Sequence, residues 1–179
     1  EKFCDELVSV CEEKKKEFLP YIVYNQTEGE TGDCPWDTLF FNQIHKDLFK
    51  NFCTQYKEKI APLLFSQFPG SYITGWFTPM VIKYHRKGQN VKLHNDTSKF
   101  TLNVKLNTEF TGCHVEFPRQ KWTNRDIPKG WCFVWPSQVT HPHVAYPLIS
   151  GTKYSLSSWT HPVEWDQNKL KGSVLYNEC

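Results

Sequence analysis

Three features in the second half of the chain have the residue types and the spacing to hold a metal ion and an acid. A His-Asn-Asp segment begins at His94 and ends at Asp96, a pair of histidines follows at His141 and His143, and a single lysine stands at Lys153. In an extended strand alternate side chains share a face, so we expect His94 and Asp96 to point at one ion. Two imidazoles and one carboxylate form the facial triad of non-haem iron(II) oxygenases, which leaves coordination positions open for substrates.

Spacing alone does not choose between His141 and His143, because residues two apart on a strand face the same side. The alternative without chemistry is that His94 and Asp96 form a surface pair near a strand end and that Lys153 is a surface strand residue. The order of the features along the chain, with a cation ten positions after the second histidine (143 to 153), is more specific than any one of them. Apolar neighbours of Lys153 favour a partly buried setting, where an ammonium group needs an anionic partner.

Length and composition limit the class of protein. A chain of 179 residues suits one domain, and an aromatic content of 16% favours a sheet-built core with aromatic pockets. The net charge of +2, without a long basic block, gives no support for a nucleic-acid partner. No apolar stretch approaches the roughly 18 residues that a membrane span needs.

The seven cysteines lack the paired spacing of a zinc module, so we expect disulfides and an oxidising compartment, with at least one thiol left unpaired by the odd count. Asn25 begins a credible glycosylation sequon, whereas the sequon at Asn95 lies inside the metal motif. The chain begins at Glu1 without an initiator Met, which indicates a mature product or an excised domain.

Two amphipathic helices are expected in the first third of the chain. Apolar residues between Phe3 and Phe18 recur close to a 3.6-residue period, and a second helix is expected from Ile44 to about Lys59, ended by Pro62 and by Pro69-Gly70. Between them, residues 20–36 carry several breakers and are expected to form a loop or irregular arm.

After Ser71 the pattern changes to short β-rich runs separated by turn residues. The predicted fold class is therefore α+β, mainly β: a double-stranded β-helix, or jelly roll, with the N-terminal helices supporting one side. The expected helical support covers about 1–70, and the β-helix core covers about 71–162. We expect strands at Tyr72–Tyr84, Phe100–Leu106, Val115–Phe117, Trp131–Trp135 and Thr152–Trp159, with turns at Gly88, Gly112, Gly130 and Gly151.

Over residues 1 to 162 the sequence resembles the catalytic domain of the procollagen lysyl hydroxylases, within the prolyl 4-hydroxylase-type superfamily of iron(II)- and 2-oxoglutarate-dependent dioxygenases. The segment from His94 to Asn107 carries most of this resemblance. Later motifs follow in the same order, at Pro128-Lys129-Gly130-Trp131, Thr140-His141-Pro142-His143 and Gly151-Thr152-Lys153-Tyr154, and Phe3-Cys4-Asp5-Glu6-Leu7 and Phe68-Pro69-Gly70 resemble the family's upstream helices.

The resemblance implies that His94, Asp96 and His143 ligate iron, and that Lys153 binds 2-oxoglutarate. The lysyl hydroxylases have arginine at that position and the prolyl 4-hydroxylases have lysine, so Lys153 departs from its nearest relatives and lacks the bidentate fork of arginine. Tyr84 and Asn103 resemble residues that line the co-substrate pocket. For Tyr84 a core aromatic is an equal alternative, whereas Asn103, an amide among apolar neighbours, needs a partner.

Other features leave alternatives open. His141 either orients a ligand or is a strand residue at the mouth of the site, and His45, His85, His114 and His161 are expected to be surface or hydrogen-bonded histidines. The family's glycine-rich stretch is reduced here to Thr111-Gly112-Cys113-His114, which casts doubt on collagen as the substrate. Residues 163–179 extend past the resemblance as either a dimer arm or a lid, so a homodimer is among the partners that the sequence allows.

The resemblance thus implies hydroxylation of a peptidyl side chain, with lysine favoured, and release of succinate and CO2. It implies Fe(II), 2-oxoglutarate and O2 as cofactors and co-substrates, is compatible with ascorbate, and suggests the endoplasmic reticulum lumen or secretion. The alternatives are a peptidyl prolyl hydroxylase, mildly favoured by Lys153, and a non-catalytic β-helix module for binding or assembly.

Overall fold

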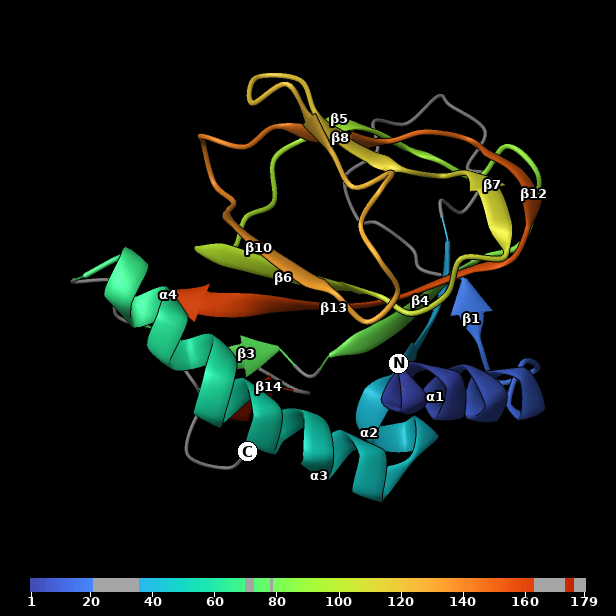
Figure 1. Ribbon diagram of the computed structural model, residues 1–179, viewed down its shortest axis with the longest axis horizontal. Helices are drawn as coiled ribbons and strands as arrows, with labels where there is room; N and C mark the ends of the chain where they lie inside the picture. The colour runs from blue at the N-terminus through green and yellow to red at the C-terminus, as the bar shows by residue number, and fades with distance from the viewer. Residues whose placement is uncertain (21–35, 70–72, 78, 163–172, 176–179) are drawn as a thin grey trace.

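Two antiparallel sheets face each other in the computed structural model, which describes residues 1–20, 36–69, 73–77, 79–162 and 173–175 (Figure 1). The large sheet contains β1 (Leu19–Pro20), β2 (Asp37–Phe40), β3 (Ile73–Phe77), β4 (Met80–Tyr84), β6 (Phe100–Lys105), β10 (Cys132–Pro136), β13 (Lys153–Pro162) and β14 (Ser173–Leu175). The small sheet contains β5 (Val91–His94), β11 (His143–Ala145), β8 (Val115–Phe117) and β9 (Trp122–Thr123), in that order across the sheet. Strands β7 (Phe110–Gly112) and β12 (Leu148–Gly151) form a separate pair at one end.

Alternation along the central strands of the large sheet divides its side chains between two faces. On β6, Leu102 and Val104 join the core under the helices, whereas Thr101 and Asn103 line the cavity between the sheets. On β13, Tyr154 and Leu156 likewise face the helices, and their odd-numbered neighbours face the cavity. One face of the sheet is therefore apolar and structural, and the other supplies polar groups to an interior site.

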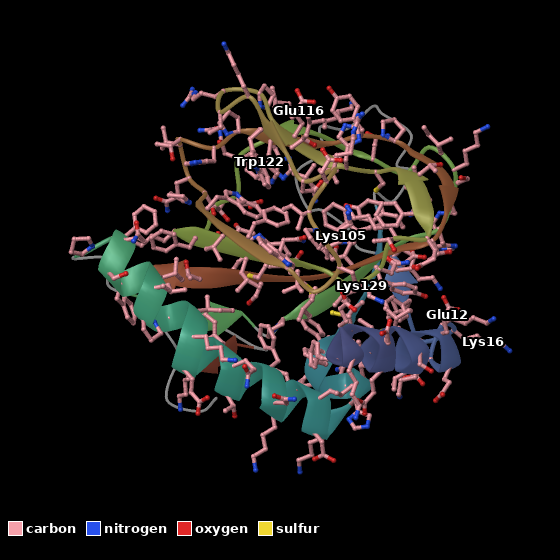
Figure 2. All side chains as sticks on the ribbon, viewed as in Figure 1. Glu12, Lys16, Lys105, Glu116, Trp122 and Lys129 are labelled. Atoms are coloured by element: carbon pink, nitrogen blue, oxygen red, sulfur yellow. The ribbon has the colours of Figure 1, made fainter. Side chains whose placement is uncertain are left out.

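The helices cover the outer face of the large sheet (Figure 1). They are α1 (Lys2–Glu13), α2 (Phe41–Ile44), α3 (Lys46–Gln55) and α4 (Ala61–Gln67), with one π-helical segment (Tyr56–Ile60) between α3 and α4. Polar contacts fix α1 at both ends: the Tyr154 hydroxyl donates to Glu12 at 2.7 Å, and Lys129 Nζ donates to Asp5 at 2.7 Å (Figure 2). The predicted class, mainly β with helical support on one side, is confirmed.

Both helix boundaries differ from the expectation. The first helix ends at Glu13 rather than Phe18, because the chain turns back so that Phe18 packs edge-on against Tyr154 in the core. The expected stop at Pro62 is wrong, since Pro62 lies in the first turn of α4. The chain is helical from Lys46 to Gln67, and the π-helical segment directly before α4 changes the hydrogen-bond pattern there, so the helical run continues past the proline.

The expected strands are present, although the run expected at Tyr72–Tyr84 contains two strands, β3 and β4. In the small sheet β8 was predicted, whereas β5, β9 and β11 were not. The expected turns are confirmed by positive φ angles at the four glycines, and two of them are strict requirements. A Cβ at Gly112 would lie 2.3 Å from the Pro147 carbonyl, and one at Gly151 would lie 2.3 Å from the Glu109 carbonyl. The close β7–β12 pair therefore needs glycine at both positions.

The five cysteines in the described part of the chain form no disulfide with one another, and four of them are buried. Cys34, Cys179 and the sequon at Asn25 lie outside the described residues, as does most of the expected arm at 20–36. Within the described ranges, no helix has the length and apolar character needed to span a bilayer.

A buried carboxylate fixes the edge of the large sheet beside the site. Asp37 on β2 accepts two hydrogen bonds from the Arg86 guanidinium, at 2.9 and 3.0 Å, and also pairs with His85. In the backbone register of β2 with β4, Asp37 lies opposite Lys83. The contacts of Asp37 with His85 and Arg86 therefore tie the turn after β4 to β2. Burial raises the pKa of Asp37, but the hydrogen bonds from Arg86 and His85 outweigh burial and hold the pKa below its ordinary value.

We expect Asp37→Asn to lower the free energy of unfolding at pH 7 by about 2 kcal/mol, because it removes charge-assisted hydrogen bonds from a buried site. A carboxyl with a lowered pKa in the folded state stabilises the fold above its unfolded pKa and loses this effect as pH falls through the folded value. The difference between variant and parent should therefore shrink below about pH 4. Urea unfolding between pH 3 and pH 7 measures it, with the exposed Asp47→Asn as control; a difference independent of pH would contradict this account.

Candidate metal centre and the cavity beside it

The site begins with the pairing of β5 and β11, which places His94 directly opposite His143. The two imidazole rings lie 4.3 Å apart between centroids. Asp96 lies two residues beyond the end of β5, where the chain crosses from the small sheet to β6 of the large sheet. One ligand atom from each of these three residues lies within 4.8 Å of the others.

His94 and Asp96 point at one place, as expected, although β5 ends at His94 and Asp96 lies in the crossover after it. The crossover brings the carboxylate back. Asp96 Oδ1 lies 3.4 Å from His94 Nε2, and Asp96 Oδ2 lies 3.7 Å from His143 Nε2. The carboxylate therefore faces the same nitrogen atom of both rings.

Both histidines are held in the same way. Nδ1 of His94 lies 2.8 Å from the carbonyl oxygen of Lys92, and Nδ1 of His143 lies 3.1 Å from that of His141. A carbonyl oxygen only accepts, so each Nδ1 carries a proton and donates it. Nε2 is then the atom of each ring that is free to bind a metal, and the backbone two residues upstream fixes its direction.

Hydroxyl groups on the large sheet hold the carboxylate. Thr101 Oγ1 on β6 donates to Asp96 Oδ2 at 2.6 Å, and the same hydroxyl lies 2.7 Å from Ser137 Oγ and 3.1 Å from Ser98 Oγ. Thr101 and Ser137 are almost fully buried. This network holds Oδ2 and prevents the carboxylate from turning, whereas Oδ1 accepts no hydrogen bond from these hydroxyl groups.

Aromatic rings enclose one side of the site. Phe117 stacks on the His143 ring at 5.2 Å between centroids, and Trp135 lies edge-on to it at 5.1 Å. The His143 side chain is 8% exposed, whereas that of His94 is 36% exposed. The site is therefore closed behind His143 and open beside His94.

The charges of the site act on one another. Burial lowers the pKa of His94, but the hydrogen bonds with Asp96 and with the Lys92 carbonyl and the charge of Asp96 together outweigh burial, so the pKa lies above its ordinary value. Burial is the stronger effect at His143, where the pKa is lowered. At Asp96 burial raises the pKa, but the hydrogen bond from Nε2 of the doubly protonated form of His94, whose proton a metal ion would displace, and the charge of His143 hold the pKa below its ordinary value. The carboxylate is thus ionised at neutral pH, as metal binding requires.

A cavity between the two sheets, which we call the site cavity, connects this centre to the other predicted residues. Its wall includes the three candidate ligands together with Tyr84, Asn103, Lys153, Trp135 and Trp159. Lys153 and Tyr84 are direct partners across β13 and β4, and Lys153 Nζ lies 5.1 Å from the centroid of the Tyr84 ring. Asn103 donates to Ser157 Oγ at 2.6 Å and keeps its amide oxygen for another partner.

Lys153 is 4% exposed, as the sequence indicated, and burial lowers its pKa. In the described part of the chain its ammonium group donates to the carbonyl oxygen of Cys113 at 2.7 Å and forms no ion pair with a carboxylate. The expected anionic partner is thus not a protein side chain among these residues. A buried ammonium bonded only to a neutral carbonyl suits a site that receives an acidic ligand.

The arrangement fits a divalent metal ion with an anionic co-ligand. Two neutral imidazole nitrogens and one carboxylate are the donor set of non-haem iron(II) sites. Nε1 of Trp135, a residue of the cavity wall, is buried and has no hydrogen-bond partner among the described residues.

The other histidines have local partners. The side chain of His141 contacts Thr140, so it is the backbone carbonyl of His141, and not its imidazole, that orients His143. Within the described part of the chain, His45 accepts from the Leu48 N–H at the start of α3, and His114 contacts Arg125. The side chain of His161 lies outside the described residues.

Sequence reasoning gave no role to Thr101, Ser137, Trp135 or Lys105. One signal was available for two of them: Thr101, Asn103 and Lys105 alternate with apolar residues on β6, and polar residues in alternate positions of a central strand indicate an interior site. Trp135 and Ser137 come from a distant strand end that the sequence does not relate to Asp96.

The sequence matches no family model. It does align with curated relatives over most of its length. It is 32% identical to human procollagen-lysine,2-oxoglutarate 5-dioxygenase 2 over 167 residues, which cover 90% of this chain and 22% of that protein. It is 29% identical to bovine procollagen-lysine,2-oxoglutarate 5-dioxygenase 1, again over 90% of this chain and 23% of the relative. The chain thus spans less than a quarter of the length of the curated relatives it matches, and the resemblance inferred from the motifs is confirmed.

Solved structures confirm the fold. A prolyl hydroxylase from Trichoplax adhaerens, in complex with a hypoxia inducible factor peptide fragment, superposes with a TM-score of 0.70 over 89% of this chain and 78% of its own, at 15% identity. A prolyl-4-hydroxylase from Pseudomonas putida gives a TM-score of 0.65 at 14% identity, with 89% and 86% coverage. A collagen prolyl hydroxylase from Paramecium bursaria Chlorella virus-1, in complex with 2OG, gives 0.61 at 18% identity and 90% coverage of both chains.

We expect Thr101→Val to weaken binding of a divalent metal by roughly tenfold, because Asp96 loses the hydrogen bond that fixes its orientation. Anaerobic titration with Fe(II), or with Co(II) followed by its visible absorption, measures the affinity. Thr38→Val serves as the matched control, since Thr38 donates to the Val81 carbonyl away from the site. Equal affinities in both variants and the parent would show that the Thr101 hydroxyl does not hold the carboxylate.

Proposed function

We propose that this chain, whose homologues are the procollagen-lysine 2-oxoglutarate 5-dioxygenases and whose fold is that of 2-oxoglutarate- and iron(II)-dependent oxygenases, is the catalytic domain of a peptidyl hydroxylase. The favoured substrate is a lysyl side chain, and the reaction consumes 2-oxoglutarate and O2 and releases succinate and CO2. The observation that carries the proposal is the convergence of His94, Asp96 and His143 on one cavity wall that also contains Lys153.

His94, Asp96 and His143 would hold the metal through two Nε2 atoms and one carboxylate oxygen. When bound, iron(II) with 2-oxoglutarate and O2 supplies the oxidising power needed to hydroxylate a C–H bond. The protein supplies position. The carbonyl oxygens of Lys92 and His141 keep each imidazole turned toward the ion, and Thr101 keeps the carboxylate in place.

Lys153 would pair with the distal carboxylate of 2-oxoglutarate. Its ammonium group has three donors, and the Cys113 carbonyl accounts for one of them. The hydroxyl of Tyr84, whose ring lies beside Lys153, and the amide of Asn103 are the polar groups best placed to add hydrogen bonds to the same molecule. Burial raises the pKa of Tyr84, so its hydroxyl stays protonated and remains a donor.

The aromatic rings around His143 would exclude water from the reacting groups on that side. Phe117 and Trp135 cover the imidazole, and the more exposed His94 marks the side from which a peptide reaches the site. Support for a peptide comes from the homologues, named for procollagen-lysine, and from the neighbouring structure that holds a peptide fragment. The sequence homologues favour lysine, whereas the structural neighbours with lower identity are prolyl hydroxylases.

Residues 1–162 are proposed to form this catalytic domain. Part of the C-terminal extension joins it, since β14 pairs with β3 at the edge of the large sheet. The homologues support a place in the secretory pathway, and a homodimer through residues 163–179 remains a proposal about assembly.

Anaerobic reconstitution with Fe(II) and 2-oxoglutarate, followed by addition of O2 and lysine- or proline-containing peptides, tests the function. We expect a gain of one oxygen atom on lysine by mass spectrometry, together with an equal amount of succinate. His143→Ala and Asp96→Ala should abolish both products. Oxygen gained on proline instead would favour the prolyl hydroxylase, and a protein that binds no iron and forms no succinate would support the non-catalytic module.

We expect Lys153→Met to raise the KM for 2-oxoglutarate by roughly one to two orders of magnitude, because a charge-assisted hydrogen bond to its carboxylate is lost. Removing a buried charge without a carboxylate partner should not destabilise the fold. Lys153→Arg restores the charge with a different geometry and should recover part of the affinity. An unchanged KM in the Lys153→Met variant would show that Lys153 does not bind the co-substrate. Lys87→Met, which changes an exposed lysine, serves as the control.

A further inference from the structure

A second hollow, of about 220 Å³, lies where β9 of the small sheet faces β10 of the large sheet. We call it the aromatic pocket, because four rings line it: Phe117, Trp122, Phe133 and Trp135, with His141 beside them. Phe117 and Trp135 are buried, whereas Trp122 is 39% exposed and lies between the small sheet and β10 (Figure 2). The pocket therefore reaches the surface of the protein beside Trp122.

The rings of the aromatic pocket pack on one another and on the metal centre. Phe133 stacks on Trp135 at 5.3 Å between centroids. Trp122 contacts both Phe117 and Phe133, at 5.4 Å in each case. Phe117 joins the pocket to the metal centre, because it also stacks on His143. Extended chain advances about 3.3 Å per residue, so a peptide with one side chain at the metal centre can place another, roughly two to four residues away, in the pocket.

The turn between β8 and β9 ties the pocket to the loop that leads to β11. The side-chain amide of Gln120, which lines the pocket, donates to the Thr140 carbonyl at 2.8 Å. Arg119 Nη1 donates to the Val139 carbonyl at 3.2 Å. The pocket wall and the chain segment before the metal ligand on β11 are therefore held together.

Strand β10 offers backbone groups beside the pocket. Within the described residues it pairs with β6 alone. The Ser137 N–H donates to the Lys99 carbonyl at 3.0 Å, so odd-numbered residues of this ladder direct their backbone groups toward β6. The N–H and C=O of Val134 then point away from β6. An extended peptide can pair with this edge, and its side chain opposite Phe133 or Trp135 would point into the pocket.

The rim of the aromatic pocket is positively charged. Arg119 and Lys121 flank Gln120 in the turn, and both are exposed. Neither forms an ion pair with a carboxylate in the part of the chain that the structure describes, and no carboxylate lines the pocket. A partner with a carboxylate next to its apolar group would complement this rim.

We propose that the aromatic pocket and the free edge of β10 bind the peptide substrate a few residues from the hydroxylated position, at a large apolar side chain with a carboxylate beside it. The volume suits one side chain and is smaller than the roughly 300 Å³ at the lower limit of small-molecule sites. Four aromatic rings favour phenylalanine in the pocket, and the cations at the rim favour aspartate or glutamate next to it. This assignment rests on the proposed function, since it takes the partner to be the peptide substrate.

Fluorescence anisotropy with labelled peptides tests the proposal without turnover. Each peptide contains one lysine and a phenylalanine that follows a glutamate, placed two, three or four residues from the lysine on either side. Comparison peptides have alanine in place of phenylalanine, or glutamine in place of glutamate. At one spacing we expect phenylalanine to strengthen binding to the parent protein by roughly tenfold, because an aromatic side chain becomes buried. Equal binding of the phenylalanine and alanine peptides at every spacing would overturn the proposal, and this comparison needs no variant.

Trp122→Ala should remove the preference for phenylalanine, because it takes away the exposed wall of the pocket. Trp131→Ala is the matched control, since Trp131 is exposed and does not line the pocket. A preference that survives in Trp122→Ala would contradict the proposal.

Lys121→Gln should weaken binding of the glutamate peptide by about threefold at low salt and leave the glutamine peptide unaffected, with Lys87→Gln as control. A glutamate peptide that binds the Lys121→Gln variant and the parent equally would overturn the assignment of a carboxylate to the rim.

Binding and turnover together separate this proposal from the proposed function. If the phenylalanine and alanine peptides bind equally and are hydroxylated on lysine with the same KM, the hydroxylase stands and the pocket assignment fails. If binding depends on phenylalanine and on Trp122 but the protein forms no succinate, the pocket stands as a peptide site of the non-catalytic module and the hydroxylase fails.

Discussion

The direct antiparallel pairing of His94 with His143 is the interaction on which the site depends. It brings together two residues that are far apart in the chain, and it places their rings 4.3 Å apart. The crossover from β5 to β6 then has only a few residues in which to reach the large sheet, so the Asp96 carboxylate faces Nε2 of both imidazoles. A shift of one residue in this register would turn one ring away from the other, because alternate side chains of a strand face opposite sides.

The large sheet carries two different functions on its two faces. Leu102, Val104, Leu156 and Tyr154 bury the helices against one face and provide the hydrophobic free energy of folding. The residues between them, among them Thr101, Asn103 and Lys153, face the interior cavity. Rigid packing on the helical side therefore fixes polar groups on the other, which is how a small domain holds several hydrogen-bond donors in fixed positions.

Buried positive charge is the main electrostatic feature of the interior. The candidate metal centre has its own carboxylate, but the cations at Lys153 and Lys105 are held by carbonyl oxygens. Leaving charge inside a protein is costly unless a partner arrives. A ligand of opposite sign is the partner that we propose for Lys153.

Local sequence by itself determined the class of fold, the turn glycines, and His94 and Asp96 as candidate ligands. A helical period, strand alternation and the φ > 0 requirement at Gly112 and Gly151 act over a few residues, so they can be inferred from the printed chain. His94 and Asp96 were named by type and spacing, whereas the family resemblance chose His143 over His141 and gave Lys153 its role. The helix stop at Pro62 failed because the π-helical segment before α4 changes the hydrogen-bond pattern and the helical run continues past the proline.

Only the tertiary structure decided how these groups meet. The register of β5 with β11, the crossover that returns Asp96, the carbonyl oxygens that fix each imidazole and the hydroxyls of Thr101 and Ser137 all join segments far apart in the chain. Such contacts depend on how whole strands pack, because the free energy that selects one register is shared among many side chains and belongs to no single short segment.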